Sequence, residues 1–247
     1  MLNKIDLNCD MGEGLGTDAG IMPFISSANI ACGYHAGDRE TIARTIDLAL
    51  QHQVSIGAHP GFADRENFGR TPQQLSDTAL YDLVATQLQI MQSICQAHGA
   101  VMTHVKPHGA LYNMAAQTPA MAQVIAKAVS DNYPQLCLYG LSNSWLIKAA
   151  VEAGLKTAGE VFADRTYQAD GSLTPRQQPG ALITSEAAAI SQVLQMVTQQ
   201  QVTTTSGKII PVAAETICLH GDGEHALPFA RAINTALRQH HISIQHI

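Results

Sequence analysis

Short apolar runs alternate with longer segments of helical periodicity along most of this chain. The runs have the length of strands, and continuous apolar runs are typical of parallel strands that are buried on both faces. Repeated strand-then-helix units predict a parallel sheet with helices on its outside, and about seven units favour a closed α/β barrel over an open sheet. The predicted strands lie at residues 4–8, 28–32, 54–58, 100–106, 136–140, 159–162 and 216–220.

The clearest helical pattern covers residues 71–99. Thr71 is suited to cap this helix, Pro72 to occupy its first position and Gly99 to end it. Apolar side chains recur at the spacing of one helix face, and Gln87 is the one polar member of that stripe. Shorter helices are predicted near residues 38–52, 118–131, 143–153, 184–199 and 225–240.

Composition narrows the class of protein. The 247 residues are 46% apolar and 14% charged, which is typical of a compact globular chain, and no linker divides it, so we expect one barrel domain over residues 1–247. A net charge of −6 without a basic cluster argues against nucleic acid as a partner.

Neither a signal peptide nor an apolar run of membrane-spanning length is evident, so we expect no membrane partner. The five cysteines form no C-x-x-C pair, which favours buried, reduced thiols and a cytoplasmic location.

The stretch HVKPHGALYN places three ionisable side chains at the end of a predicted strand. Side chains alternate between the two faces of a strand, so His104, Lys106 and His108 point the same way. A lysine on the inner face of a barrel needs an anion beside it, either a carboxylate such as Asp10 or Glu160 or a bound ligand. We expect Lys106 to act on a ligand more than as a structural ion pair.

The other strands repeat this arrangement. Ionisable groups stand at the carboxyl ends of strands, where parallel barrels carry their sites. Burying so many charges without a purpose would cost several kcal/mol each, so the pattern predicts a catalytic or ligand site at this mouth. The sets that share a face are Asp6, Asn8 and Asp10; Asn29 and His35, if the second strand runs straight through NIACGYH; Ser55, Gly57 and His59; Glu160 and Asp164; and Cys218, His220 and Asp222.

Two loops add detail. The glycine-rich segment 9–18 permits backbone N–H groups to approach an anion or substrate, although it is not a Walker A loop. Residues 61–70 carry Asp64, Arg65, Glu66 and Arg70 around an aromatic side chain and favour a lid or a charged interface loop.

Six segments together resemble the LamB/YcsF family over residues 4–224. The resemblance implies an incomplete TIM-like barrel with seven strands, akin to the glycoside hydrolase/deacetylase superfamily. It also implies ATP-dependent opening of 5-oxo-L-proline to L-glutamate, with ADP and phosphate as further products, by a complex with two more subunits, B and C. The segments are LNCDMGEG, SANIACGYHAGD, GAHPGFADRENFGR, HVKPHGALYN, GEVFADRTYQADGSLTPR and ICLHGDG.

That reaction suggests roles for the residues at the mouth. A five-membered lactam is a poor electrophile, and phosphorylating its oxygen would make the ring carbon reactive toward water. Lys106 suits the anionic group, Asp10, His59 or His108 the base, and Glu160 or Asp222 the proton donor. Mg²⁺ with ATP would need carboxylates such as Asp10, Glu13 and Glu160. The candidates are, as catalytic residues, Asp10, His59, Lys106, His108 and Glu160, and, as substrate-binding residues, Asn8, Glu13, Asn29, His35, Asp164, His220 and Asp222.

Two alternatives stay open. Asp10, His35 and His59 are a possible metal site of the deacetylase kind, which would make the protein an amidohydrolase that needs no ATP. The absence of an H-x-x-x-H pair counts against that alternative. The other alternative is a carrier or scaffold subunit, which the excess of acids and bases opposes.

Overall fold

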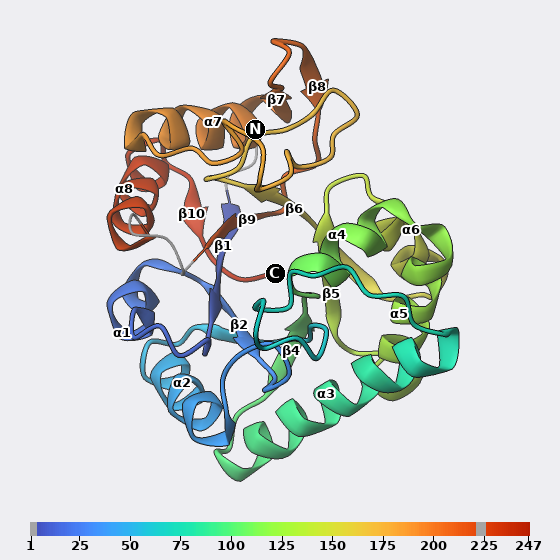
Figure 1. The fold of residues 1–247 in the computed structure, drawn as a ribbon. Helices are drawn as coiled ribbons and strands as arrows, with labels where there is room; N and C mark the ends of the chain where they lie inside the picture. Colours follow the sequence, from blue (N-terminus) through green and yellow to red (C-terminus); the bar gives the residue numbers. More distant parts are fainter. Residues whose placement is uncertain (1–3, 221–225) are drawn as a thin grey trace.

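Seven parallel strands form a closed barrel with helices packed around it (Figure 1). The computed structural model describes residues 4–220 and 226–247. The strand order confirms the predicted TIM-like α/β barrel with one strand fewer than the usual eight. In barrel order, the strands are β1 (Lys4–Met11), β2 (Ser27–Ala31), β3 (Ser55–His59), β4 (Met102–Val105), β5 (Cys137–Leu141), β6 (Lys156–Phe162) and β9 (Thr216–Leu219).

The barrel closes through β9, which pairs with both β6 and β1. Thr216 is opposite Glu160 of β6 and opposite Asp6 of β1, and all these pairings are parallel. The short strand β10 (Ser243–Ile244) adds to the beginning of β1. Because closure leaves no free edge among the seven strands, the inner faces of all of them surround one interior.

Helices connect the strands, as the alternating pattern predicts. The five shorter helices expected from the sequence are all present, whereas α4, which starts directly after His108, was not predicted. The hairpin of β7 (Gln201–Thr203) and β8 (Ile209–Pro211) precedes β9. The helical segments are α1 (Asp18–Ile21), η1 (Met22–Phe24), α2 (Arg39–Gln51), α3 (Asp77–Ala97), α4 (Gly109–Gln117), α5 (Pro119–Asn132), α6 (Trp145–Glu152), α7 (Glu186–Gln199) and α8 (Ala226–Gln239).

The start of α3 differs from the prediction. The helix begins at Asp77, and the Ser76 side chain caps it by accepting a hydrogen bond from the Ala79 N–H. The predicted cap Thr71 and first-turn Pro72 lie in the preceding loop, and Pro72 lines a cavity. A serine adjacent to the first apolar turn competes successfully with a threonine five residues earlier. The predicted end at Gly99 agrees with its positive φ of 66°.

The second strand also ends earlier than a straight run through NIACGYH requires. It stops at Ala31, and the chain then turns through Gly33, whose φ is 88°. Strand parity therefore does not place His35, which reaches the barrel mouth from a loop. Gly37 packs so tightly there that a Cβ would lie 2.5 Å from the Gly12 carbonyl oxygen, so the loops after β1 and β2 are in direct contact.

Strand β1 presents one polar face and one apolar face. In β1, Leu7, Cys9 and Met11 belong to the apolar core that packs against the helices. The alternate residues, Asp6 and Asn8 among them, are buried in polar surroundings inside the barrel. Beside β1, the interior is therefore a hydrogen-bonded polar layer instead of the branched apolar side chains that fill many barrels, whereas Cys137, Tyr139 and Ala158 of β5 and β6 form a small apolar cluster.

No helix in the described part of the chain has the length and apolar character needed to span a membrane.

Gly57 in β3 should be essential for the fold. A Cβ at this position would lie 2.1 Å from Nε2 of His104, so an added methyl group must displace that buried ring. We expect Gly57→Ala to destabilise the protein by about 2 kcal/mol or more, as overpacked cores do.

Urea unfolding measures this effect, with Gly20→Ala as the matched control. The added Cβ of Gly20→Ala would meet only the end of Leu227, at 3.4 Å. Equal stability of the two variants would contradict the prediction.

Candidate functional site

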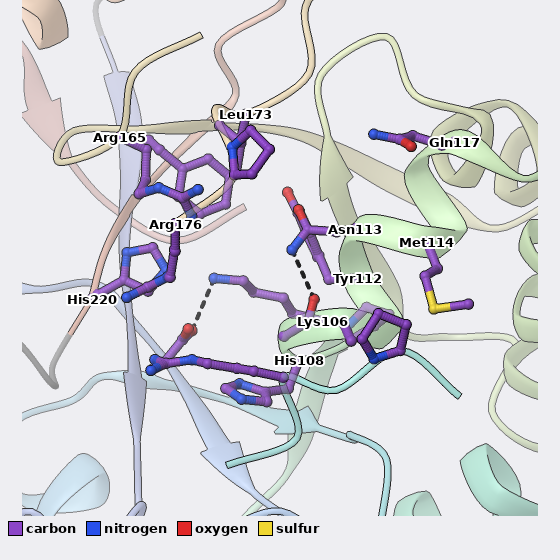
Figure 2. Close-up of a pocket in the computed structure, with 18 of the residues that line it drawn as sticks. Lys106, His108, Tyr112, Asn113, Met114, Gln117, Arg165, Leu173, Arg176 and His220 are labelled. Carbon is purple, nitrogen blue, oxygen red and sulfur yellow. Dashed lines mark hydrogen bonds and ion pairs between the residues drawn. The ribbon is translucent and has the colours of Figure 1, made fainter. Parts of the chain in front are cut away.

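A cavity of about 310 Å³ opens at the C-terminal ends of the strands, the end expected for the site (Figure 2). Lys106 lies at its centre, Arg165, Arg176 and His220 lie on one side, and residues of α4 lie on the other. The ionisable and polar side chains on its wall are Asp10, His59, Arg70, Lys106, His108, Tyr112, Asn113, Gln117, Arg165, Arg176, Gln177 and His220.

Lys106 connects three strands across the barrel. Its Nζ lies 2.9 Å from Oδ1 of Asp10 on β1 and 2.8 Å from Oε1 of Glu160 on β6. It also donates to Oδ1 of Asn8 at 3.3 Å and to Sγ of Cys218 at 3.0 Å. All these groups are buried. Lys106, Asp10 and Glu160 therefore form an ion-paired triad in a low-dielectric interior.

Electrostatics keep Lys106 and Asp10 charged. Burial alone would lower the pKa of Lys106, but Asp10, Cys218 and Glu160 together hold that pKa well above its usual value. Burial would raise the pKa of Asp10, but His59 and Lys106 hold it well below its usual range. The structure therefore pairs the lysine with the two carboxylates that the sequence offered as its counter-ions, and the expectation that it acts mainly on a ligand stays a prediction.

A polar layer beneath the triad fixes its carboxylates. The Asn29 amide donates to Oδ1 of Asn8 at 2.7 Å and to Oδ1 of Asp10 at 2.9 Å. The Asn8 amide in turn donates to Oε1 of Glu160 at 3.0 Å. The His104 Nε2–H donates to Oδ1 of Asn29 at 3.0 Å, because the Asn29 amide nitrogen is already used as a donor. Asn8 and Asn29 thus position the charged groups from below.

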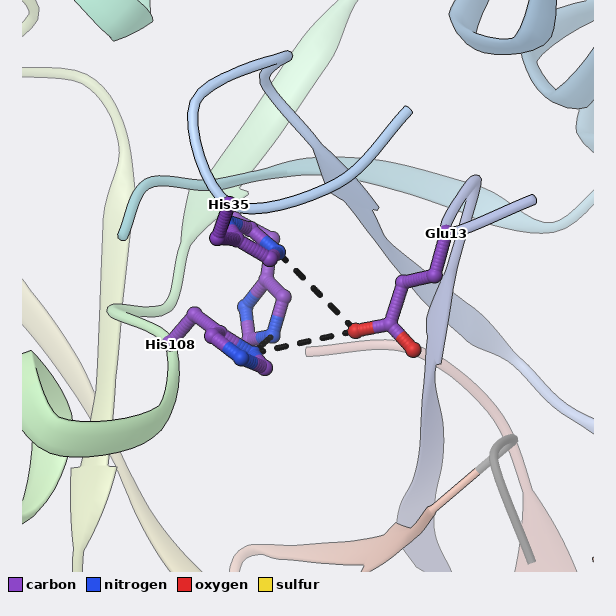
Figure 3. Close-up of side chains that lie close together, drawn as sticks. Glu13, His35 and His108 are labelled. Carbon is purple, nitrogen blue, oxygen red and sulfur yellow. Dashed lines mark hydrogen bonds and ion pairs between the residues drawn. The ribbon is translucent and has the colours of Figure 1, made fainter. Parts of the chain in front are cut away.

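A second group of side chains lies beside the triad. The histidine cluster comprises His35, His59 and His108 together with Glu13 (Figure 3). The rings of His35 and His108 stack with centroids 3.9 Å apart. Oε1 of Glu13 lies 3.9 Å from Nε2 of His35 and 3.7 Å from Nδ1 of His108. His59 connects the two groups, since its Nε2 lies 3.3 Å from Oδ2 of Asp10.

Two of these histidines are held in their neutral form. Burial, together with neighbouring histidines, lowers the pKa of His108 to about 3 and that of His35 well below its usual value. Neutral imidazole and carboxylate are the ligand types that divalent transition metals prefer. The four donor atoms of the cluster lie within 4.8 Å of one another, and so do those of a second set, Asp10, Cys218 and His220.

The cationic side of the cavity lies along residues 163–185, which follow β6. His220 Nδ1 donates to Asp164, 2.9 Å from Oδ2, and this imidazole stacks on Phe162. Arg165 is buried and donates to the Thr174 carbonyl oxygen at 2.6 Å, and burial and the charge of Arg176 lower its pKa to about 10. Two guanidinium groups on one wall make this side of the cavity suited to an anion.

The sequence candidates thus occupy one end of the barrel. The triad, the polar layer and the histidine cluster hold most of them, and Asp164 and His220 form the pair beside the two arginines. Asp222 lies outside the described residues. Which of these side chains are catalytic and which bind substrate stays a prediction.

Several residues of the cavity were not predicted. Arg70, Tyr112, Arg165 and Arg176 all line it, and the three arginines come from long loops in which strand parity says nothing. Tyr112 lies on the unpredicted helix α4. The signal available in the sequence was the scarcity of cations, since arginines in a post-strand loop stand out among only 14 lysines and arginines.

The loop at residues 61–70 packs over the histidine cluster. The Phe68 carbonyl oxygen accepts a hydrogen bond from Nε2 of His108 at 2.8 Å, and the Arg65 guanidinium donates to the Gly37 carbonyl oxygen. Asp64 accepts from the Thr71 N–H at 3.2 Å and so closes the loop on itself. This charged loop therefore covers the cluster, while its expected role as a lid stays a prediction.

The deacetylase-type metal set named as an alternative, Asp10, His35 and His59, stays a prediction, and the structure gathers two of its members with other donors. Asp10 is committed to Lys106 and Asn29, while Glu13 and His108 join His35 and His59. Parity could not identify Glu13, because it follows Gly12, whose φ is 69°, and leaves the strand.

Known proteins resemble this chain over nearly its whole length. The LamB/YcsF family matches residues 5–247. The A subunit of a 5-oxoprolinase from Brevibacillus brevis is 52% identical over 241 residues, which are 96% of this chain and 95% of that protein. The solved structure of a lactam utilization protein from Thermus thermophilus is 38% identical, covers 99% of this chain and all of its own, and has a TM-score of 0.92.

The fold also resembles more distant enzymes. A family 4 carbohydrate esterase from Streptomyces lividans, solved with acetate, matches with a TM-score of 0.51 over 99% of this chain and 92% of its own, at 13% identity. That likeness concerns the barrel alone and is consistent with the deacetylase-like architecture expected from the sequence.

Removing the charge of Lys106 should destabilise the protein. Lys106→Met leaves Asp10 and Glu160 buried without their cation, so we expect a loss of about 3–5 kcal/mol in the free energy of unfolding. Urea denaturation measures this, with Lys127→Met as the control. Lys127 is exposed and paired with Asp131 on the surface, so its loss should change stability little. A full-stability Lys106→Met variant would mean that the lysine mainly serves a ligand.

His104 should make the protein sensitive to acid. Burial lowers its pKa to about 3, whereas the unfolded chain binds this proton near pH 6.5. The stability is therefore complete above about pH 6.5 and is lost as the pH falls toward 3.

His104→Gln retains an amide that can donate to Asn29 but removes the titration. Between about pH 6 and pH 4, its unfolding free energy should fall less steeply than that of the wild type, by about 1.4 kcal/mol per pH unit. Urea unfolding at a series of pH values tests this, and identical slopes would refute it.

Proposed function

This chain belongs to the LamB/YcsF family, and from that premise we propose that it is the A subunit of an ATP-dependent 5-oxoprolinase, which opens 5-oxo-L-proline to L-glutamate. The observation that carries the proposal is the 52% identity to the A subunit of a 5-oxoprolinase along nearly the full length of both chains. The likeness to a lactam utilization protein supports the same substrate class, since 5-oxoproline is a lactam.

The cavity suits such a substrate in size and charge. A volume of about 310 Å³ accommodates a five-membered ring with one carboxylate. Arg165 and Arg176 offer a carboxylate or a phosphoryl group the planar donors that it accepts best. We assign the substrate carboxylate to this wall, which directs the ring toward Lys106 and Asp10.

The chemistry requires an activated lactam and two water molecules. ATP would transfer its γ-phosphoryl group to the lactam oxygen and leave as ADP, and the first water would then add to the ring carbon. The ring C–N bond breaks, the nitrogen gains a proton, and the second water hydrolyses the resulting acyl phosphate to glutamate and phosphate. Lys106 is held protonated and suits the developing negative charge on oxygen. Asp10 is held ionised at the cavity wall and suits the role of base for water.

The proton donor for the ring nitrogen is best assigned to His220. Its Nδ1–H is bound by Asp164, so Nε2 is left to exchange protons at the cavity wall. Glu160, a candidate from the sequence, is engaged through Oε1 with Lys106 and Asn8.

We assign ATP and its Mg²⁺ to the complex with the B and C subunits. Two of the carboxylates that the sequence offered to Mg²⁺, Asp10 and Glu160, are already paired with Lys106. The proposal therefore needs partner subunits for complete turnover.

Reconstitution tests this proposal. We expect glutamate and phosphate from 5-oxoproline and ATP only when this chain is mixed with the B and C subunits, and none from this chain alone. Arg176→Gln should raise the KM for 5-oxoproline in the complex by roughly 10-fold or more, as expected for one lost charge-assisted hydrogen bond.

Arg44→Gln, on the outer helix α2, is the matched control and should behave as wild type. Amide hydrolysis by the isolated chain without ATP would contradict the proposal and favour the amidohydrolase alternative.

A further inference from the structure

Two histidines of the cluster, His59 and His108, point a ring nitrogen at each other. Nδ1 of His59 lies 2.7 Å from the Lys106 carbonyl oxygen, and Nε2 of His108 lies 2.8 Å from the Phe68 carbonyl oxygen. A carbonyl oxygen only accepts, so each of these ring nitrogens carries the proton. When both rings are neutral, the other nitrogens, Nε2 of His59 and Nδ1 of His108, both present lone pairs, and they are 2.9 Å apart.

Two lone pairs at that distance repel each other unless a cation lies between or beside them. The His35 ring adds a second anomaly, because both of its nitrogens are buried and have no hydrogen-bond partner among the described residues. An imidazole without partners in a protein interior costs free energy and calls for an explanation. Its Nε2 faces the same space as the two lone pairs and the Glu13 carboxylate.

We propose that Glu13, His35, His59 and His108 form a binding site for one divalent transition-metal ion such as Zn²⁺. Ligand atoms in a tetrahedral site with bonds of about 2.1 Å lie about 3.4 Å apart. The donor atoms of His59 and His108 are 2.9 Å apart, and the Glu13 oxygen lies 3.7 Å from that of His108 and 3.9 Å from that of His35. These separations lie on either side of the ideal value. Small side-chain movements therefore bring the four atoms to coordination distance.

The surroundings resemble those of a built metal site. Ligand histidines usually donate their second nitrogen to a carbonyl or a carboxylate, which fixes the tautomer, and His59 and His108 both do so. Glycine is required behind His35, since a Cβ on Gly61 would lie 2.6 Å from its Nδ1 and one on Gly69 would lie 2.8 Å from its Cβ. The site is thus preorganised by close backbone approach.

Gln87 holds the backbone that lies next to His35. It is the one polar residue of the buried α3 stripe, and its amide binds both the N–H and the carbonyl oxygen of Gly61, at 3.0 and 2.8 Å. This clamp holds the backbone that presses against His35. An otherwise costly buried amide is thereby explained as support for the cluster.

The donor set selects the type of ion. Three imidazoles and one carboxylate suit Zn²⁺, Ni²⁺ or Fe²⁺, whereas Mg²⁺ and Ca²⁺ require oxygen ligands. The alternative cation is a single proton shared by His59 and His108. Burial opposes a charged ring at His108, while the Asp10 carboxylate, 3.3 Å from His59, favours one. Direct metal binding separates these two possibilities.

His59 and His108 also line the cavity, so the ion would lie at its wall. A metal there supplies a Lewis acid beside the carboxylate of Asp10. This inference concerns the ligands alone and stands whether or not the proposed substrate is correct.

Metal binding to the untagged full chain, after removal of bound ions with a chelator, tests the proposal. We expect one Zn²⁺ per chain by metal analysis after dialysis, and by calorimetry an affinity at least about 100-fold higher for Zn²⁺ than for Mg²⁺. Glu13→Gln keeps the shape of the carboxylate and should weaken Zn²⁺ binding by at least about 10-fold. His35→Leu should weaken it on the order of 100-fold.

Matched controls are His52→Leu and Glu152→Gln, which change exposed residues on other parts of the chain and should retain full affinity. Melting temperatures without metal verify that each variant is folded, and Glu13→Gln decides the result if His35→Leu does not fold. Absence of stoichiometric Zn²⁺, or binding that both cluster variants retain, would overturn the proposal. Binding lost only in Cys218→Ser would assign the ion to Asp10, Cys218 and His220 and would also overturn it.

Discussion

The ion-paired Lys106 is the interaction on which the rest of the site depends. Its ammonium group meets one carboxylate from β1 and one from β6, so three strands of the barrel converge on a single buried charge. A lone ammonium in this interior would be prohibitively costly, and so would either carboxylate alone. The three groups therefore require one another, and any sequence that keeps one of them must keep the others.

This requirement extends into the layer below. The carboxylates of Asp10 and Glu160 have more lone pairs than one lysine can satisfy, and the amides of Asn8 and Asn29 supply the additional donors. Asn29 in turn needs the His104 ring, which fits only because position 57 is glycine. This series of polar groups thus depends on the charges of Lys106, Asp10 and Glu160 at its upper end. At its lower end it depends on the space that Gly57 leaves for the His104 ring. An unpaired polar group in this interior is costly, which accounts for the extent of the network, and Oε2 of Glu160 is one buried oxygen that has no hydrogen-bond partner among the described residues.

Much of this arrangement was accessible from the sequence where strand parity applies. Asn8, Asp10, His59 and Glu160 are on regular strands and Lys106 directly follows one, so a period of two is enough to place their side chains inside the barrel.

Parity fails where the backbone leaves the strand. Glu13 and His35 follow glycines with positive φ, and Arg165 and Arg176 lie in a long loop whose path depends on tertiary contacts. The position of Lys106 was predictable, whereas its pairing required knowledge of which strands lie opposite each other after closure.

The charge distribution divides the barrel mouth into two halves that meet at His59. On one side, the triad of Lys106, Asp10 and Glu160 carries one positive and two negative groups, so it tolerates a further cation nearby. On the other side, burial keeps His35 and His108 of the histidine cluster neutral, and the cluster presents lone pairs. The two groups meet at the 3.3 Å approach of His59 to Asp10. A cation held by the histidines would therefore be attracted by the excess negative charge of the triad, and the same excess explains why arginines, not further acids, form the opposite wall.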